Sequence, residues 1–327
     1  MLSSITKQLT LLLVFSIFHI SAMAQNRSFQ EVDRHAASIT QKPSDVATLA
    51  QQLTEPFASD LEKSRAIFMW IALNVQYDCR KFHNPQRPQI KATSKEELDR
   101  KVEEWQKDQV EKTAKSKKGV CEDYSQLFKA MCDAVGVEAV VIHGNARDFY
   151  RPHRSAHNNP HAWNAVKIDG QWHLLDATWA AGYTDPEVKK FSRKLASGFF
   201  MPPPAWFAQN HFPDDEKWQL LETPVDKAAF AQQPMINFGQ DDFPILDFSE
   251  NIAAVNGKGY DRELRIKLSK QPKFLALATQ KGKAIKHTRI SENGYEVFRF
   301  SSRGVRDLVL YGGNSQKKMG WLGKYDL

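Results

Sequence analysis

A cysteine stands at the start of an amphipathic helix in the segment 119–136. After Cys121, the apolar residues Leu127, Met131 and Val135 recur every four positions, and this spacing predicts one buried helix face. A glycine closes the segment, as is common just beyond a helix C-terminus. The positive end of a helix dipole favours a thiolate, so this position suits a nucleophile. The alternative is a small buried apolar side chain, which is the commoner role of a lone cysteine.

The chain after this helix is rich in β-forming residues. Residues 138–143, 162–168 and 172–176 predict three strands, and Asp169-Gly170 predicts a hairpin turn between the second and third. A helix followed by antiparallel strands indicates an α+β fold in which the helix packs on the sheet. We expect residues 180–225 to form extended cover for this sheet.

Upstream of the cysteine, the sequence predicts mainly helices. Periodic apolar residues and polar cap residues predict helices over residues 44–53, 60–75 and 94–112. The last of these is charged on most sides, so we expect it to be exposed. Residues 79–92 contain two prolines and are interpreted as a loop.

The pattern changes near residue 235. Residues 263–268, 274–278, 295–300 and 308–311 alternate with the period of two that is typical of half-buried strands. Asn256-Gly257 and Asn293-Gly294 predict turns between strands, so we expect a small all-β, immunoglobulin-like sandwich. The predicted domains are a signal peptide (1–24), a catalytic α+β domain with N-terminal helices (25–230) and the β-sandwich domain (235–327).

The first residues predict export rather than a part of the fold. Leu9 to Ile20 is almost wholly apolar, and Ala22-Met23-Ala24 has the small-x-small pattern of a cleavage site. The apolar run is too short to span a bilayer comfortably, and no second run of spanning length follows. We therefore expect an exported protein, periplasmic or secreted, without stable membrane insertion.

Charge and cysteine content exclude several classes. The net charge of +7 is mild and no nucleic-acid recognition motif accompanies it, so nucleic acid is not an expected partner. Three cysteines are too few for a disulfide framework, and Cys79 and Cys132 are interpreted as buried thiols. His153, His157 and His161 are spaced like metal ligands on a helix, but the neighbouring prolines favour a loop. No acidic, glycine-centred calcium loop is present, and we expect no metal or cofactor.

Two residues are placed to complete a cysteine-based site. His161 begins the second predicted strand and Asp176 ends the third, so the hairpin brings them to the same end of the sheet. Asp176 is then positioned to bind one nitrogen of His161, which leaves the other nitrogen to accept the proton of Cys121. This is the nucleophile–base–orienting group arrangement found on unrelated folds. Alone, each would have a structural role, as a surface histidine or a turn cap.

Three separated motifs resemble those of the transglutaminase-like superfamily: Gly119-Val120-Cys121, His161-Ala162-Trp163 and Asp176-Ala177-Thr178-Trp179. Tyr77-Asp78 resembles the upstream element of this superfamily. The segments 65–71, 164–168 and 211–221 are similar to the kyphoscoliosis-peptidase branch, so the resemblance covers about residues 60–222. It implies a papain-like core, with Cys121 as nucleophile, His161 as base and Asp176 as orienting group.

The implied reaction is attack of Cys121 on an amide carbonyl of a protein or peptide, giving a thioester. The Cys121 backbone N–H is expected to stabilise the oxyanion, with a second donor near Gln76–Tyr77. Water as acceptor gives peptidase or deamidase activity, which we favour, and an amine gives transglutamination. The alternative is a catalytically silent binding or scaffold protein on the same fold. The sequence leaves the oligomeric state open.

Overall fold

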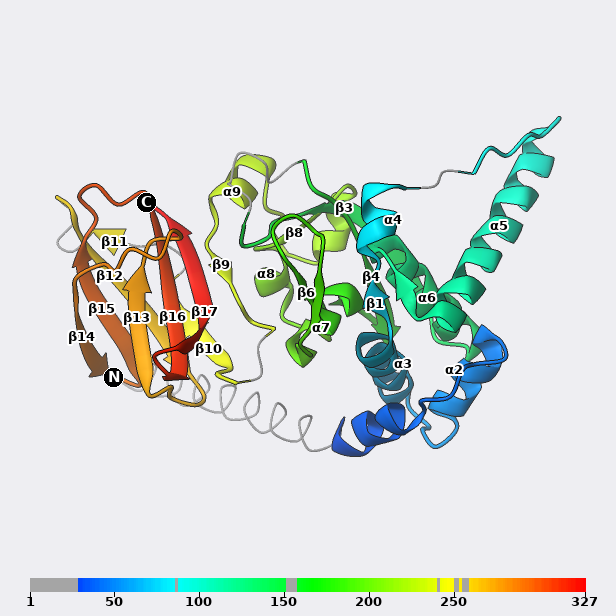
Figure 1. Ribbon diagram of the computed structural model, residues 1–327, viewed down its shortest axis with the longest axis horizontal. Coiled ribbons are helices and arrows are strands. Elements are labelled where there is room, and N and C mark those ends of the chain that lie inside the picture. Colours follow the sequence, from blue (N-terminus) through cyan, green and yellow to red (C-terminus); the bar gives the residue numbers. More distant parts are fainter. Residues whose placement is uncertain (1–28, 86–87, 151–157, 240–241, 250–252, 255–258) are drawn as a thin grey trace, which may run out of the picture.

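The computed structural model describes residues 29–85, 88–150, 158–239, 242–249, 253–254 and 259–327. The molecule is elongated, with helices gathered at one end and the strands of the C-terminal region at the other (Figure 1). We call the described residues of 29–232 the N-terminal part and those of 235–327 the β part. The predicted signal peptide lies outside the described residues.

Residues 29–38 are helical. The further helices and 3-10 turns are α2 (Val46–Thr54), α3 (Asp60–Asn74), α4 (Cys79–His83), α5 (Lys95–Ser116), α6 (Cys121–Ala134), α7 (Ala177–Ala181), η2 (Ser197–Phe199), α8 (Pro204–Phe207), η3 (Glu216–Gln219) and α9 (Lys227–Gln232).

The strands of the N-terminal part are β1 (Gln76–Tyr77), β2 (Lys118–Gly119), β3 (Ala139–Ala146), β4 (Pro160–Ile168), β5 (Gln171–Leu175), β6 (Gly182–Thr184), β7 (Phe191–Arg193) and β8 (His211–Pro213). The strands of the β part are β9 (Met235–Ile236), β10 (Ile245–Phe248), β11 (Ala253–Ala254), β12 (Asp261–Leu268), β13 (Phe274–Ala278), β14 (His287–Glu292), β15 (Tyr295–Ser301), β16 (Asp307–Ser315) and β17 (Lys318–Asp326).

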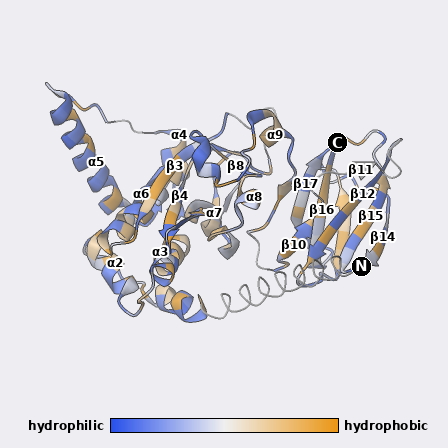
Figure 2. Cartoon of the chain, turned by 180° about the vertical axis from the view of Figure 1, so that it is seen from behind, coloured by the Kyte–Doolittle hydropathy of each residue, from blue (hydrophilic) through white to orange (hydrophobic). Residues whose placement is uncertain are grey.

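The helices expected upstream of the cysteine are present as α2, α3 and α5, and each begins at a polar cap. The side chains of Asp45, Ser59 and Ser94 accept the backbone N–H three residues on. The interpretation of residues 79–92 as a loop was wrong at its start, because Asp78 caps the short helix α4 by accepting from two backbone N–H groups. Helix α5 projects from the body of the molecule and is hydrophilic along most of its length (Figure 2).

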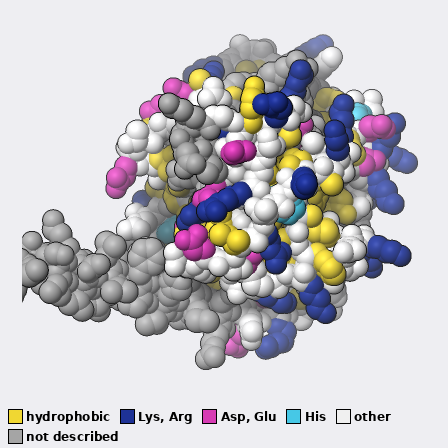
Figure 3. Space-filling view, turned by 90° about the vertical axis from the view of Figure 1, so that its left-hand side faces the viewer, with side chains coloured by type: hydrophobic (Ala, Val, Ile, Leu, Met, Phe, Trp, Pro, Cys, Tyr) yellow, Lys and Arg dark blue, Asp and Glu magenta, His cyan; other side chains and the backbone are white. Residues whose placement is uncertain are grey.

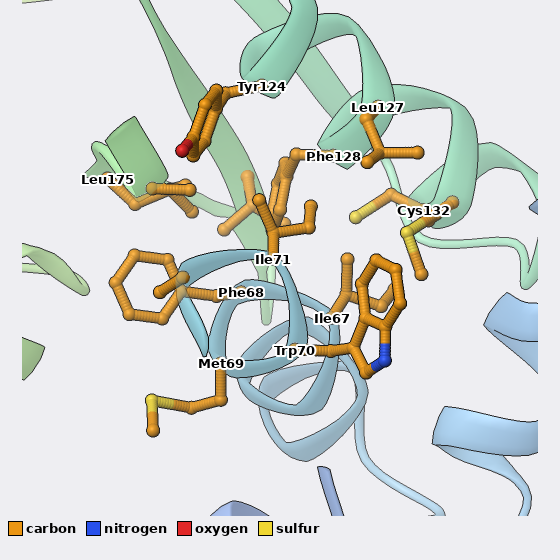
Figure 4. Close-up of a cluster of buried hydrophobic side chains, with 14 of the residues drawn as sticks. Ile67, Phe68, Met69, Trp70, Ile71, Tyr124, Leu127, Phe128, Cys132 and Leu175 are labelled. Atoms are coloured by element: carbon orange, nitrogen blue, oxygen red, sulfur yellow. The ribbon is translucent and has the colours of Figure 1, made fainter. Parts of the chain in front are cut away.

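The core of the N-terminal part forms where α6 packs on α3 and on the central sheet. Figure 4 shows side chains of both helices meeting, among them Ile67 and Trp70 from α3 and Phe128 and Cys132 from α6. All four are fully buried. Burying a large apolar side chain contributes about 1.5–3 kcal/mol, so this contact fixes α6, and with it the residue at its N-terminus.

The central sheet has the strand order β5-β4-β3-β8 and is antiparallel throughout. The predicted hairpin is confirmed: Asp169 and Gly170 have φ values of 50° and 79°, the left-handed conformation that a tight hairpin turn requires. Pairing of Asn164 with Leu175 leaves His161 just beyond the paired region, beside the residue that follows β5. Residues 180–225 were expected only to cover the sheet, but β8 within them extends it by a fourth strand.

The β part contains two antiparallel sheets. One has the order β10-β12-β15-β14, with β11 also paired to β12, and the other has the order β13-β16-β17-β9. Their inner faces share a core that includes Leu264 and Phe298 from the first sheet and Leu277 and Leu310 from the second. The mixed α+β fold with antiparallel sheets at its C-terminal end is therefore confirmed. The turn predicted at 256–257 lies outside the described residues.

The two parts are joined by what we call the aromatic seam, formed by Phe199, Trp206, Phe238 and Phe248. Trp206 packs against the cores of both parts, and the ring centroids of Phe199 and Phe238 lie 4.9 Å apart. A Cβ atom at Gly239 would lie 2.3 Å from the Phe199 ring. The close approach of the two parts therefore requires glycine at that position.

Among the residues that the structure describes, no helix combines the length and the apolar character needed to cross a membrane.

Candidate active site

Cys121 is the first residue of α6 and is half-buried. The preceding turn is held by Asp123, whose carboxylate accepts the Val120 backbone N–H at 2.8 Å and pairs with Lys81 at 2.7 Å. A Cβ atom at Gly119 would lie 2.5 Å from the Asp123 Cβ. The glycine before the cysteine is therefore required by the side chain that caps the helix.

His161 and Asp176 meet at the open end of the β4–β5 hairpin. The Nε2 atom of His161 lies 2.7 Å from Oδ2 of Asp176. Both side chains are buried, with 8% and 1% of their surfaces exposed. The other Asp176 oxygen, Oδ1, accepts the Trp179 backbone N–H at 3.0 Å, which makes Asp176 the N-cap of α7. The carboxylate is thus fixed in the orientation that His161 needs.

Cys121 lies close enough to His161 to raise the pKa of its imidazole. Because Nε2 of His161 binds Asp176, Nδ1 is the nitrogen left for the sulfur. Burial lowers the pKa of His161, but the Asp176 carboxylate outweighs burial and raises it to about 10, and Cys121 adds to this rise. The His161 partner also helps to hold the pKa of Asp176 below its usual range, against the effect of burial. The arrangement therefore favours an imidazolium between two acidic groups.

A residue that the sequence analysis did not assign to the site, His211, also contacts Asp176. Its Nε2 lies 3.0 Å from the same Oδ2, and its Nδ1 lies 2.7 Å from the side-chain oxygen of Asn210. The imidazole stacks on Phe207 with ring centroids 3.9 Å apart. Burial lowers the pKa of His211 to about 4, so it is neutral at neutral pH. Because a neutral imidazole carries one proton, His211 is a second donor to Asp176 through Nε2 when the Asn210 amide presents its NH₂ group, rather than its oxygen, to Nδ1.

Aromatic side chains enclose the two histidines. Trp179 lies 5.6 Å from His161 and 4.7 Å from His211, measured between ring centroids, and Trp163 lies within 6.0 Å of both. These rings exclude water from the Asp176 carboxylate. A low local dielectric strengthens the hydrogen bonds to it.

The ligand atoms of His161, Asp176 and His211 all lie within 4.8 Å of one another, which is compatible with a metal site. Ligand atoms that each lie about 2.0–2.2 Å from a tetrahedral zinc ion are about 3.3–3.6 Å from one another. The 2.7 and 3.0 Å contacts are instead those of hydrogen bonds. An ion here would replace both hydrogen bonds, so the observed geometry fits a hydrogen-bonded carboxylate better than a metal centre.

The three residues predicted from sequence are thus brought together by α6, β4 and the start of α7. The parallel pairing of β1 with β2 places Gln76–Tyr77 beside the cysteine turn, where a second oxyanion donor was expected; that role stays a prediction. Cys132 is buried as expected, whereas Cys79 is only partly buried. His153 and His157 lie outside the described residues.

The comparisons with known proteins agree with this geometry. Residues 47–177 match the family model described as Transglutaminase-like superfamily.

Among curated relatives, kyphoscoliosis peptidase of Mus musculus is 34% identical over 206 residues, which cover 62% of this chain and 28% of that protein. Hillarin of Drosophila melanogaster is 27% identical over 222 residues, which cover 64% of this chain and 25% of that protein. The chain thus spans only about a quarter of the length of these relatives. A solved structure of a TGase is 15% identical to this chain, and the match covers 54% of this chain and 40% of that structure with a TM-score of 0.29.

Proposed function

We propose that this protein is a thiol enzyme that attacks amide carbonyl groups of protein or peptide substrates through Cys121. The observation that carries the proposal is the position of His161, which is hydrogen-bonded to Asp176 at one nitrogen and lies close enough to Cys121 for that residue to raise its pKa. A cysteine, a histidine and an oriented carboxylate form the arrangement that activates a sulfur nucleophile. The name of the related kyphoscoliosis peptidase of Mus musculus agrees with this class.

In the proposed reaction, His161 takes the proton of Cys121 and the sulfur bonds to the amide carbon. The backbone N–H of Cys121, at the start of α6, is placed to donate to the resulting oxyanion. Collapse expels ammonia or an amine, which receives the proton from His161, and leaves a thioester. Water then attacks the thioester, His161 takes a proton from that water, and the sulfur leaves and is reprotonated.

The acceptor decides the outcome. Water gives peptide cleavage or side-chain deamidation, and a substrate amine gives a crosslink. We favour water as the acceptor for an exported protein. The competing candidate is a silent binding protein, in which the same residues would persist without turnover.

The test compares the wild-type protein with Cys121→Ala and, as the matched control, Cys79→Ala, which removes another partly accessible thiol. We expect Cys121→Ala to abolish conversion of a peptide library offered with and without an amine donor, and Cys79→Ala to retain it. Mass spectrometry distinguishes cleavage, deamidation and crosslinking. If iodoacetamide labels Cys121 no faster than Cys79 and the wild type converts no peptide, the silent binding protein is the correct alternative.

We further propose that the protein is exported through its first 24 residues. The support is the apolar segment followed by Ala22-Met23-Ala24 in the sequence. N-terminal sequencing of protein from a fractionated host should find Gln25 as the first residue, outside the cytoplasm. A first residue of Met1 would contradict the proposal.

A further inference from the structure

Cys121 and His161 lie in a cleft to which both parts of the molecule contribute. The cleft has a volume of about 1230 Å³. Small-molecule sites commonly measure about 300–1,000 Å³, so this cleft is larger than a single amide group needs. Its walls include α4 and β6 of the N-terminal part and β9, β16 and β17 of the β part.

Five aromatic side chains on the walls of this cleft form what we call the aromatic belt: Phe149, Tyr150, Tyr183, Tyr311 and Trp321. The ring of Phe149 lies 5.2 Å from that of Trp321 and 5.4 Å from that of Tyr150. Besides burial, Tyr183 helps to raise the pKa of Tyr150, and Tyr150 helps to raise the pKa of Tyr311, so the three phenol groups lie near one another. The belt therefore crosses from one part of the molecule to the other.

Two members of the belt are unusually open to solvent. Tyr150 is 48% exposed and Tyr183 is 55% exposed, although their rings face a concave surface. Exposed aromatic rings gathered in a cleft are typical of binding surfaces, because each ring offers a large, rigid contact area.

The belt is held in place by hydrogen bonds across the two parts. The backbone oxygen of Phe149 accepts from Gln280 Nε2 at 2.8 Å and from Lys324 Nζ at 3.1 Å. Lys324 is only 4% exposed, so this contact is shielded from water. A rigid wall loses little entropy when a ligand binds, which favours affinity.

A glycine beside the belt, Gly320 on β17, leaves room for a polypeptide backbone. It lines the cleft and is paired with Gly312 on β16, whose own missing side chain makes space for Leu322. A Cβ atom at Gly320 would meet nothing within 4 Å. Glycine in a strand interior often marks a place where another backbone approaches closely.

The charges on the walls do not favour one sign: Lys81, Lys194, Lys270, Asp148, Asp185 and Asp242 all contribute. We therefore propose that the cleft binds an extended segment of the substrate polypeptide and seats one of its aromatic side chains against the aromatic belt. This inference rests on the proposed function, because the reactive amide of the same segment would lie at Cys121. It makes the β part a contributor to substrate selection.

The test separates binding from turnover by using the full chain with Cys121→Ala. This protein is immobilised and exposed to a library of random decapeptides, and retained peptides are identified by mass spectrometry. We expect retained peptides to be enriched in Phe, Tyr and Trp. Adding Trp321→Ala or Tyr183→Ala should weaken retention roughly 10- to 30-fold, the effect of removing an aromatic hot-spot residue.

Tyr260→Ala is the matched control, because Tyr260 is 54% exposed, lies on the β part and does not line the cleft. It should leave retention unchanged, and Trp321→Phe should retain most of it. Equal retention by Trp321→Ala, Tyr183→Ala and Tyr260→Ala overturns the inference, as does absence of aromatic enrichment or of any retained peptide. Retained aromatic peptides that the wild type does not convert would instead contradict the proposed function alone.

Discussion

The two parts of the molecule use charged groups in opposite ways. In the N-terminal part, the Asp176 carboxylate is buried and shared by His161 and His211. In the β part, charged side chains pair on the surface, as Glu263 does with Arg265 and Arg299. Figure 3 shows dark blue and magenta side chains interspersed on the end of the molecule that the β part forms. Buried, shared charges alter protonation and so support chemistry, whereas exposed pairs chiefly maintain solubility.

The sharpest test of this contrast is Asp176→Asn. The variant keeps an oxygen for the Trp179 N–H but removes the charge that raises the pKa of His161. We expect kcat/KM to fall on the order of 10³- to 10⁴-fold, by analogy with other triads. The alkaline limb of the pH–rate profile should also move to lower pH. An unchanged profile would show that Asp176 does not set the protonation of His161.

The second test asks whether His211 belongs to the same unit. His211→Leu removes one donor to the Asp176 carboxylate, and a hydrogen bond to a charged group contributes about 1.5–3 kcal/mol. We therefore expect kcat/KM to fall roughly 10- to 100-fold. The fall should appear mainly in kcat, because His211 is too deeply buried to touch substrate.

The same variant should change how stability depends on pH. Burial lowers the pKa of His211 to about 4 from an unfolded value near 6.5, so the folded state binds fewer protons in this window. Stability contributed by neutral His211 is therefore present above pH 6.5 and is lost as pH falls to 4, by roughly 3 kcal/mol. Urea unfolding at several pH values should show a weaker dependence of stability on pH in His211→Leu. Parallel curves for both proteins would contradict this assignment.

A third test concerns the boundary between the two parts. Gly239→Ala places a Cβ atom against the Phe199 ring, and overpacking of this kind costs about 1–3 kcal/mol. We expect a lower free energy of unfolding by urea. Gly320→Ala is the matched control, because a Cβ atom there would meet nothing within 4 Å and its φ is outside the left-handed region. A loss for Gly239→Ala no larger than that for Gly320→Ala would contradict close packing at the seam.

The smallest effect is expected on the surface of the β part. Arg299→Met breaks an exposed pair with Glu263, and such pairs contribute about 0–1 kcal/mol. Stability should therefore change by less than about 1 kcal/mol, and activity should not change. A loss of activity in this variant would contradict the conclusion that exposed ion pairs of the β part do not support the chemistry.

The sequence predicted the three central residues because local rules place them. A glycine–cysteine turn precedes a periodic helix, and the Asp169-Gly170 turn sets the register that brings His161 to Asp176. The helices with polar caps were predictable for the same reason, since the cap lies beside the helix that it begins.

His211 was not predictable as a partner of Asp176 by such rules. It lies 35 residues away in the three-residue strand β8, whose pairing with β3 depends on the tertiary fold. Strand β17 was also missed. Gly320, Gly323 and the buried Lys324 interrupt its apolar alternation, and the reason for a buried lysine, the backbone oxygen of Phe149, is far away in sequence.

The molecule is fastened across the cleft in two places, at the aromatic seam and where Lys324 and Gln280 reach Phe149. A movement of the two parts away from each other would break the packed rings of the aromatic seam or the shielded hydrogen bonds to Phe149. The folded structure therefore fixes the width of the cleft. Under the proposed function, a substrate would therefore have to enter as an unfolded terminus or a flexible loop, and a folded domain would not fit.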